Sequence, residues 1–132
     1  PVRAVVAREG LGANLPEDAV YASTTEDAAG QPLEGGRTYT IDMPADVPVN
    51  AFWSVTAYDE RGNLLRGADS GLTVSGNAES GAQRIVISPE RPDGGPWLRA
   101  PDSGPYRLLM RLYWPDQVVL DGQWAFPPVQ PG

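Results

Sequence analysis

The sequence predicts an all-β domain, an antiparallel β-sandwich or jelly roll with a short N-terminal helix. The 14 prolines and 15 glycines are spread along all 132 residues, which leaves little room for long helices and favours short strands joined by turns. Strand-like stretches recur about every ten residues, a spacing typical of a sandwich. With 41% apolar residues, the chain has enough apolar material for one core. We therefore expect a single domain over residues 1–132.

A helical lead-in is predicted at residues 1–12. Residues 2–10 contain good helix formers, and Gly10 and Gly12 stand where a helix C-terminus commonly places glycine. The Gly-Leu-Gly triplet superficially resembles a phosphate-binding loop, but it follows no predicted strand. We interpret it as a helix stop.

Two strands are predicted in the next part of the chain. Residues 19–25 are β-prone and precede a turn at residues 27–30. In residues 37–43 apolar and polar side chains alternate, which predicts a strand with one buried face. The apolar positions of that strand are Tyr39, Ile41 and Met43.

Three further strands are expected at residues 51–59, 71–76 and 83–89. The turn residues 60–63 connect the first of them to a return strand that begins at Leu64 and Leu65. Pro89 ends the last one, because proline has no amide donor for the ladder. The exposed loop 89–96 follows.

The C-terminal part predicts one long strand and one short strand. Residues 106–114 alternate, and the expected apolar face is Tyr106, Leu108, Met110, Leu112 and Trp114. A last short strand is expected at residues 123–126, within a C-terminal tail, residues 123–132, that lies over the surface.

The composition excludes several classes of chemistry. The chain has no cysteine and no histidine, which rules out thiolate nucleophiles, disulfides, Cys/His zinc sites and imidazole bases. All ten basic residues are arginine, so a Schiff-base lysine is also excluded. The net charge of −7 argues against a nucleic acid partner, and no apolar run reaches the ~18 residues of a membrane span. We expect no cofactor and no metal ion.

Two aromatic tracts, residues 51–65 and 96–115, predict a candidate ligand-binding surface. Its residues are Phe52, Tyr58, Arg107, Arg111 and Tyr113, provided that they share one sheet face. A guanidinium binds oxyanions bidentately and aromatic rings supply apolar contact, so this set suits a carboxylate, a sugar face or a planar ligand. The alternative is that these side chains are cross-strand pairs on a half-exposed sheet. The four tryptophans are interpreted as core or edge-packing residues.

Two acidic pairs form a second candidate: Glu17 with Asp18, and Glu26 with Asp27. Two carboxylates about 5 to 9 Å apart serve glycoside hydrolysis, and clustered carboxylates hold calcium. The alternative is that these are helix-start and turn acids, which such positions favour electrostatically. No catalytic residue is assigned.

Several ordered blocks of the sequence resemble the bacterial family known as domain of unknown function 1214. These blocks are residues 10–21; Asp27, Gly30 and Leu33; residues 52–59; Trp97, Leu98, Ala100 and Pro101; and residues 111–115. The resemblance implies a jelly-roll-like fold, and many members are exported or anchored in bacteria. It supplies no established catalytic residue. This chain is shorter than the family between Arg66 and Asn77, so a function borne by that segment does not carry over.

The leading functional hypothesis is a non-enzymatic binding or assembly module of the bacterial envelope or exterior. The alternatives are a carboxylate-based hydrolase, for example on glycosides, and a structural support domain for an upstream partner domain. The expected partners are a small-molecule or carbohydrate ligand, and a second copy of the chain or that upstream domain. Because translation does not start at proline, Pro1 predicts a processed or trimmed upstream segment, and we expect an exported, periplasmic or membrane-anchored protein.

Overall fold

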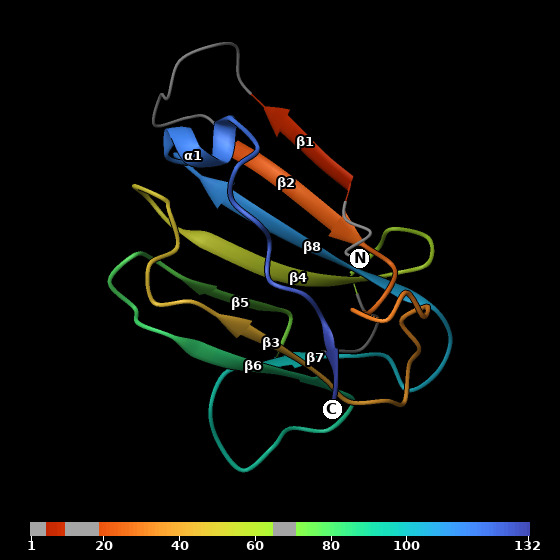
Figure 1. Ribbon diagram of the computed structural model, residues 1–132. Helices are drawn as coiled ribbons and strands as arrows, with labels where there is room; N and C mark the ends of the chain where they lie inside the picture. The colour runs from red at the N-terminus through yellow and green to blue at the C-terminus, as the bar shows by residue number, and fades with distance from the viewer. Residues whose placement is uncertain (1–4, 10–18, 65–70) are drawn as a thin grey trace.

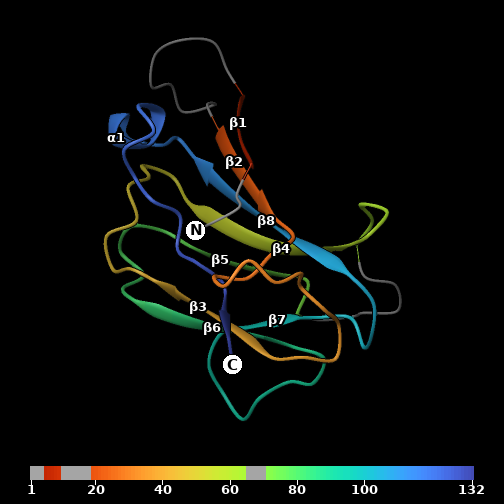
Figure 2. The ribbon, with the colours of Figure 1, turned by 45° about the vertical axis from the view of Figure 1, so that its right-hand side comes forward.

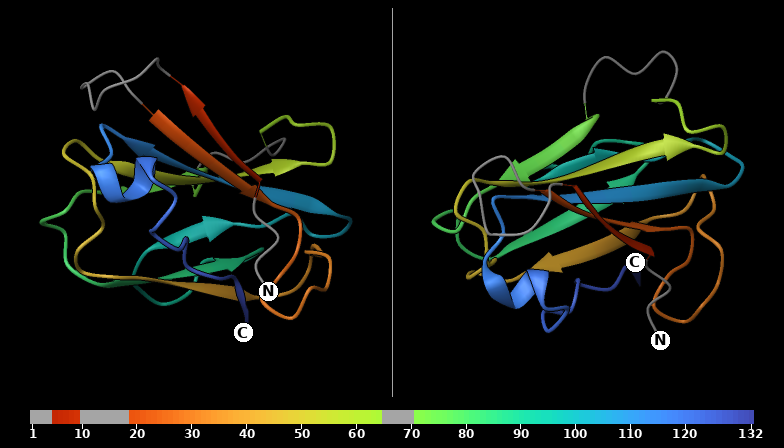
Figure 3. Two further views of the ribbon diagram at one scale, coloured as in Figure 1. Left: turned by 45° about the horizontal axis from the view of Figure 1, so that its top comes forward. Right: turned by 90° about the horizontal axis from the view of Figure 1, so that it is seen from above.

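The computed structural model describes residues 5–9, 19–64 and 71–132, and it shows two β-sheets packed face to face (Figure 1, Figure 3). The five-stranded sheet contains, in spatial order, β1 (Val5–Glu9), β2 (Ala19–Thr24), β8 (Tyr106–Tyr113), β4 (Trp53–Asp59) and β5 (Thr73–Gly76). The four-stranded sheet contains β7 (Trp97–Arg99), β6 (Gln83–Ser88), β3 (Tyr39–Met43) and β9 (Gln130–Pro131). All pairs are antiparallel except β6 with β7. The predicted β-sandwich is confirmed.

The core lies between the two sheets and follows the period of two seen in the sequence. In β3, Tyr39, Ile41 and Met43 are buried, while the intervening Thr40 is half-buried and Asp42 is exposed. The opposing sheet supplies the buried residues Val20, Ala22, Trp53, Val55, Ala57, Val74, Leu108, Met110 and Leu112. Each sheet therefore buries one face against the other, as expected of a sandwich.

Two predicted strands end differently from the expectation. β8 buries Tyr106, Leu108, Met110 and Leu112 as predicted, but it ends at Tyr113. Trp114 has a φ of 52°, in the left-handed region, and is only half-buried. After the turn that follows β4, Leu64 forms a single isolated bridge with Tyr58. The second residue of the predicted return strand, Leu65, lies outside the described residues.

The predicted N-terminal helix is wrong over Val5–Glu9, which is strand β1. It pairs antiparallel with β2, with Val5 opposite Ser23 and Glu9 opposite Ala19. The helix propensity of this segment is a local preference worth only tenths of a kcal/mol per residue. The edge of β2 offers backbone groups that need partners, and this pairing outweighs the propensity. Residues 1–4 and 10–12 of the prediction lie outside the described residues.

The C-terminal region also corrects the prediction. Residues 123–126 form no strand; instead the short helix α1 (Gln117–Leu120) is followed by residues 121–129, here called the C-terminal strap, and then by β9. The strap runs from α1 toward β3 (Figure 2). Its Val129 is 5% exposed, and Trp124 and Phe126 pack against the core, whereas Gln123 and Ala125 are exposed. The strap thus lies over the core and buries part of its side chains.

Strand β7 was not predicted as a separate strand. It has only three residues and pairs parallel with β6, from Val86 opposite Trp97 to Ser88 opposite Arg99. Within the ranges that the structure describes, no helix has the length and apolar character needed to cross a membrane.

Candidate functional site

The outer face of the five-stranded sheet brings together the five residues of the predicted surface. In β8 the alternation that buries Leu108, Met110 and Leu112 turns Arg107, Arg111 and Tyr113 to the other face. Tyr58 of β4 lies opposite Arg107 in the ladder, and Phe52 directly precedes β4. The condition on which the hypothesis depended, a shared face, is therefore met.

Phe52 and Tyr113 form a stacked aromatic pair at one end of this face. Their ring centroids are 4.4 Å apart with an interplanar angle of 24°. The amide of Tyr113 donates a hydrogen bond of 2.9 Å to the carbonyl of Phe52, which holds the two backbones in register. Phe52 is 46% exposed, a high value for so large an apolar side chain. The pair presents an apolar surface to solvent.

Arg111 occupies the centre of the face, between two tyrosines. Its Nη2 donates a hydrogen bond of 3.2 Å to Tyr58 Oη. Its guanidinium also lies over the ring of Tyr21, 5.6 Å from the centroid, a cation–π geometry. Tyr21 lies directly opposite Arg111 in the β2–β8 ladder. We call Tyr21, Tyr58 and Arg111 the tyrosine–arginine cluster.

Tyr21 is a site residue that the sequence reasoning missed. Its strand was predicted, and the alternation within residues 19–24 places Tyr21 on the face opposite to Val20 and Ala22, which are buried. That pattern alone marks Tyr21 as outward-facing. Its position beside Arg111 follows from the pairing of β2 with β8, a contact between segments about ninety residues apart, on which local pattern has no bearing.

The tyrosines around Arg111 raise the pKa of its guanidinium. Burial lowers the pKa of Arg111, but the hydrogen bond from its guanidinium to Tyr58 and the neighbouring Tyr58, Tyr113 and Tyr21 raise it, and the net pKa is above the usual value. Among the described residues Arg111 forms no ion pair with a carboxylate. A contrasting arginine, Arg84 on the four-stranded sheet, pairs with Asp42 at 2.9 Å in an exposed position.

Arg107 lies in a different electrostatic setting. It is exposed and, together with Glu26, Glu60 and Tyr106, lines a hollow of about 280 Å³. Two carboxylates on the same hollow offset the positive potential around Arg107. Arg111 is therefore the stronger candidate to meet an anion, although the protein as a whole has a net charge of −7.

Hydroxyl groups fill the part of the face between Arg111 and β5. Ser54 of β4 lies between two ladder partners, Arg111 of β8 and Ser75 of β5. Thr56 Oγ1 and Thr73 Oγ1 are 3.0 Å apart and share a hydrogen bond. The face therefore combines aromatic rings, hydroxyls and the guanidinium of Arg111, which has no ion pair in the described part of the chain. Such groups recognise carboxylates and sugar rings.

Of the acidic pairs, Asp27 is a turn acid. Asp27 is 5% exposed, and its Oδ1 accepts hydrogen bonds from the amides of Ala29 at 2.9 Å and Gln31 at 3.0 Å. This is the turn role given as the alternative. Glu17 and Asp18 lie outside the described residues. In the described ranges no three acidic groups come together in a way that would hold a metal ion.

The tryptophans are packing residues, as predicted. Trp53 and Trp97 are 1% and 6% exposed, and Trp114 and Trp124 are half-buried. The Nε1–H of Trp97 donates to the carbonyl of Ser88 at 3.1 Å, and the guanidinium groups of Arg91 and Arg99 lie 5.3 and 4.7 Å from the centroid of its ring. These contacts secure β7 against β6.

Comparison with known proteins agrees with this fold. The VPA0106 protein from Vibrio parahaemolyticus superimposes with a TM-score of 0.73 at 25% sequence identity, covering 86% of this chain and 30% of that protein. A putative uncharacterized protein from Burkholderia cenocepacia gives 0.62 at 16% identity, covering 85% of this chain and 29% of that one. The chain thus spans less than a third of each of these structures. No curated protein matches it.

A family comparison identifies the domain. The family described as "Protein of unknown function (DUF1214)" matches residues 18–117, from the start of β2 to the start of α1. The match contains the strands that build the tyrosine–arginine cluster. It confirms the resemblance seen in the sequence blocks. The chain belongs to the DUF1214 family.

Proposed function

We propose that this domain is a non-enzymatic binding module that binds a carboxylate-bearing ligand with a sugar or planar body on the outer face of its five-stranded sheet. One observation supports this above the others. Arg111 is a charged guanidinium between two tyrosines, on an acidic protein, and no ion pair within the described part of the chain neutralises it.

The chemistry of the cluster favours this class of ligand. A guanidinium presents several N–H donors in a planar fork, and one donor of Arg111 is used by Tyr58. The remaining donors can engage a carboxylate bidentately, which an ammonium group does not reproduce. The stacked Phe52–Tyr113 pair offers apolar contact to the body of the ligand. The exposed hydroxyl of Ser75 lies on the same face and suits sugar hydroxyl groups, whereas Ser54 is only 7% exposed.

A second candidate function, the carboxylate-based hydrolase, is favoured by one observation. Glu26 and Glu60 line the same hollow as Arg107, so two carboxylates meet a space of about 280 Å³. A hydrolase of this kind would release the chromophore from a chromogenic glycoside, and Glu60→Gln would abolish that release. Absence of release from any glycoside in a broad panel would remove this candidate.

The module is proposed to work as part of a larger protein in the bacterial envelope or exterior. The two solved structures that share its fold are each more than three times as long as the stretch they share with it, which supports a role beside other domains. The support-domain alternative would be favoured if the outer face bound no ligand. Fractionation of cells that express the full-length protein tests the location, because a protein found only in the cytoplasm would contradict it.

Thermal-shift measurements with matched ligands test the binding proposal. The probes are glucuronate and galacturonate, with glucose and galactose as their uncharged counterparts. We expect the uronates to raise the melting temperature of the wild type by about 2–5 °C at roughly ten times Kd, and the neutral sugars to raise it less. Added salt weakens the effect, because the charge interaction is near the surface.

Three arginine variants make this test specific. Arg111→Ala removes the guanidinium, Arg111→Lys keeps the charge without the fork, and Arg84→Ala removes an exposed arginine from the other sheet. The uronate shift should vanish in Arg111→Ala, weaken in Arg111→Lys and persist in Arg84→Ala. A shift of equal size in Arg111→Ala, or no shift with any carboxylate, would contradict the proposal.

A further inference from the structure

A second feature, independent of the outer face, is an apolar cavity between the two sheets behind the C-terminal strap. Its volume is about 40 Å³. Its walls come from four strands and the strap, and the main apolar side chains are Ala22, Ile41, Val55, Leu108, Met110 and Phe126. Since ~10–15 Å³ is enough for one water molecule, the cavity has room for about three groups of that size. The apolar part of these walls favours apolar occupants.

The cavity exists because one wall is short of side-chain volume. Ala22 lies directly opposite Met110 in the β2–β8 ladder and is 5% exposed, so its methyl group leaves space where a larger residue would fill the core. On the other side the strap approaches with Pro127 and Pro128, whose rings do not reach into the sheet as a long side chain would.

The strap over the cavity is held at its ends. Val129 accepts a hydrogen bond of 2.8 Å from the amide of Ala28, and the amide of Gln123 donates to Val118 at 3.0 Å. In the described part of the chain, residues 124–128 form no backbone hydrogen bond with either sheet. Between these ends the strap is held by side-chain packing, in which the rings of Phe126 and Trp124 meet edge to face with centroids 5.2 Å apart. Phe126 can therefore move without breaking a ladder.

The polar residues of the cavity lining are Ser23, Thr24, Glu26 and Asp27, where β2 runs into the following turn, and we call this end of the cavity its mouth. Asp27 is 5% exposed and its Oδ1 accepts two amide hydrogen bonds. The negative charge of the two carboxylates repels an anionic head group and favours one that is cationic or donates hydrogen bonds. The chemistry of the mouth is thus opposite to that of the tyrosine–arginine cluster.

We propose that this cavity binds the terminal alkyl chain of a small amine or alcohol, with Phe126 as its movable cover. The alkyl end occupies the apolar interior beside Met110, and the head group stays at the mouth near Glu26. Binding is weak, in the millimolar range, because so short a chain buries little apolar surface. The site takes a different class of ligand from the one proposed for the outer face.

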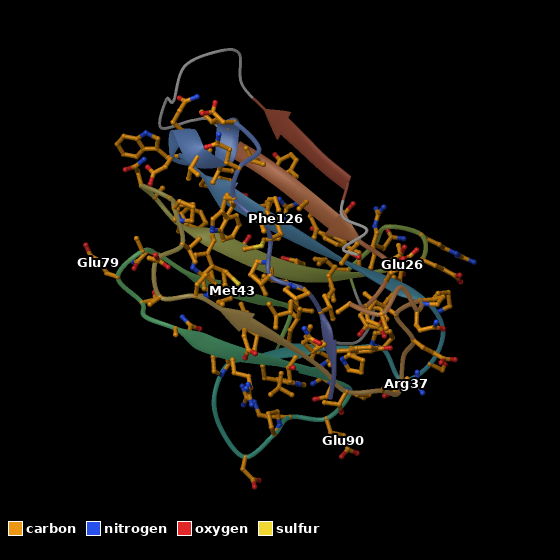
Figure 4. All side chains as sticks on the ribbon, viewed as in Figure 1. Glu26, Arg37, Met43, Glu79, Glu90 and Phe126 are labelled. Atoms are coloured by element: carbon orange, nitrogen blue, oxygen red, sulfur yellow. The ribbon has the colours of Figure 1, made fainter. Side chains whose placement is uncertain are left out.

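The two methionines of the chain give a direct test. Met110 lines the cavity, whereas Met43 is buried in the core outside its lining, near the end of β3 (Figure 4). In protein labelled with ¹³C at the methionine methyl groups, n-butylamine and 1-butanol should shift the Met110 resonance and leave Met43 nearly unchanged. Butyrate, with the same chain and an anionic head, should shift Met110 at least several-fold less.

Ala22→Val is the blocking variant, because two added methyl groups fill the space opposite Met110 and valine suits a strand. Ala28→Val, on the turn side of the lining, is a second blocking variant should the first disturb the fold, which the Met43 resonance reports. The ligand-induced shift of Met110 should disappear in the folded blocking variant. A shift that persists there, a shift equally large at Met43, or no shift with either neutral or cationic ligand would overturn the proposal.

Discussion

Trp53 shows at the scale of one residue how the core depends on a single aromatic side chain. It is 1% exposed, and a Cβ built on Gly76 of the neighbouring strand would come within 2.7 Å of its ring. Position 76 is thus limited to glycine by the indole that covers it. The sequence predicted Trp53 as a packing residue, and its burial in the core confirms this prediction.

Trp53→Ala is expected to lower the free energy of unfolding by about 3–5 kcal/mol, because the mutation leaves a large cavity in a close-packed interior. The adjacent Phe52 is 46% exposed, and Phe52→Ala should cost less than about 1 kcal/mol. Urea unfolding followed by circular dichroism measures both. Equal losses in the two variants would show that the assignment of inner and outer faces is wrong.

Tyr106 is a buried residue whose hydroxyl is unusual. It is 2% exposed, and no hydrogen-bond partner for its Oη is found among the described residues. Burial, and secondarily the charge of nearby Tyr39, raise the pKa of Tyr106 well above its usual value of 10.0. The folded protein therefore holds this proton more tightly than the unfolded chain does.

This shift predicts a loss of stability in alkali. Below about pH 10 both states are protonated and the contribution is fully present; above it the unfolded state loses the proton first, so stability falls as pH rises toward the folded pKa. Tyr106 contributes a slope of at most about 1.4 kcal/mol per pH unit. Tyr106→Phe should be close to neutral at pH 7 and should flatten the decline between pH 10 and 11 in urea unfolding. An identical decline in the variant would refute this assignment.

At the scale of elements, two Asp-x-x-Gly turns share one geometry. Asp27 and Asp59 each accept amide hydrogen bonds from the residues two and four positions later, at 2.9 to 3.0 Å. Gly30 and Gly62 each follow the aspartate by three residues and have φ of 81° and 84°. Glycine is required there because other residues rarely adopt a positive φ. The first of these turns coincides with one of the blocks that resemble the DUF1214 family.

The two turns differ in burial, and this predicts different costs. Asp27 is buried, whereas the hydrogen bonds of Asp59 are exposed to solvent. Asp27→Ala should destabilise the domain by about 2–3 kcal/mol, because two amides lose a charged acceptor away from water; Asp59→Ala should cost about 1 kcal/mol. Thermal unfolding of the two variants side by side measures the difference. If Asp59→Ala cost as much as Asp27→Ala, burial would not be the cause.

Local alternation of apolar and polar residues predicted the strands whose buried face follows that alternation. It failed for segments whose structure depends on contacts with distant parts of the chain. β3 and β8 were predicted with the correct buried face because one side of each strand meets the core at every second residue. β1 was predicted as a helix because its pairing with β2 is not encoded in its own propensities. The C-terminal strap was misjudged for the same reason, since the core that it covers is built from strands far earlier in the chain.

At the scale of the whole molecule, the strand order creates the candidate site. β8 lies between β2 and β4, so three segments far apart in the chain contribute Arg111, Tyr21 and Tyr58 to one cluster. The sequence predicted that five residues would share a face, because each tract has its own alternation. The sequence did not show which of the two arginines has acidic neighbours. Glu26 and Glu60 come to line the same hollow as Arg107 only when the chain folds.

The sandwich also separates two regions of opposite character. The outer face presents a guanidinium and aromatic rings to solvent, whereas the cavity between the sheets has an acidic mouth and an apolar interior. A carboxylate ligand is suited to the first and repelled by the second. Ligands of opposite charge should therefore perturb opposite faces of the same strands, β2, β4 and β8.

The most direct test of the outer-face proposal is an NMR titration of the ¹⁵N-labelled domain with glucuronate. We predict that the largest shifts fall on the outward residues of β2, β8 and β4, above all the Arg111 side-chain Nε–H and the amides around Tyr21 and Tyr58. Shifts centred instead on the four-stranded sheet around Arg84, or no saturable shift at all, would contradict the assignment of this face as the binding site.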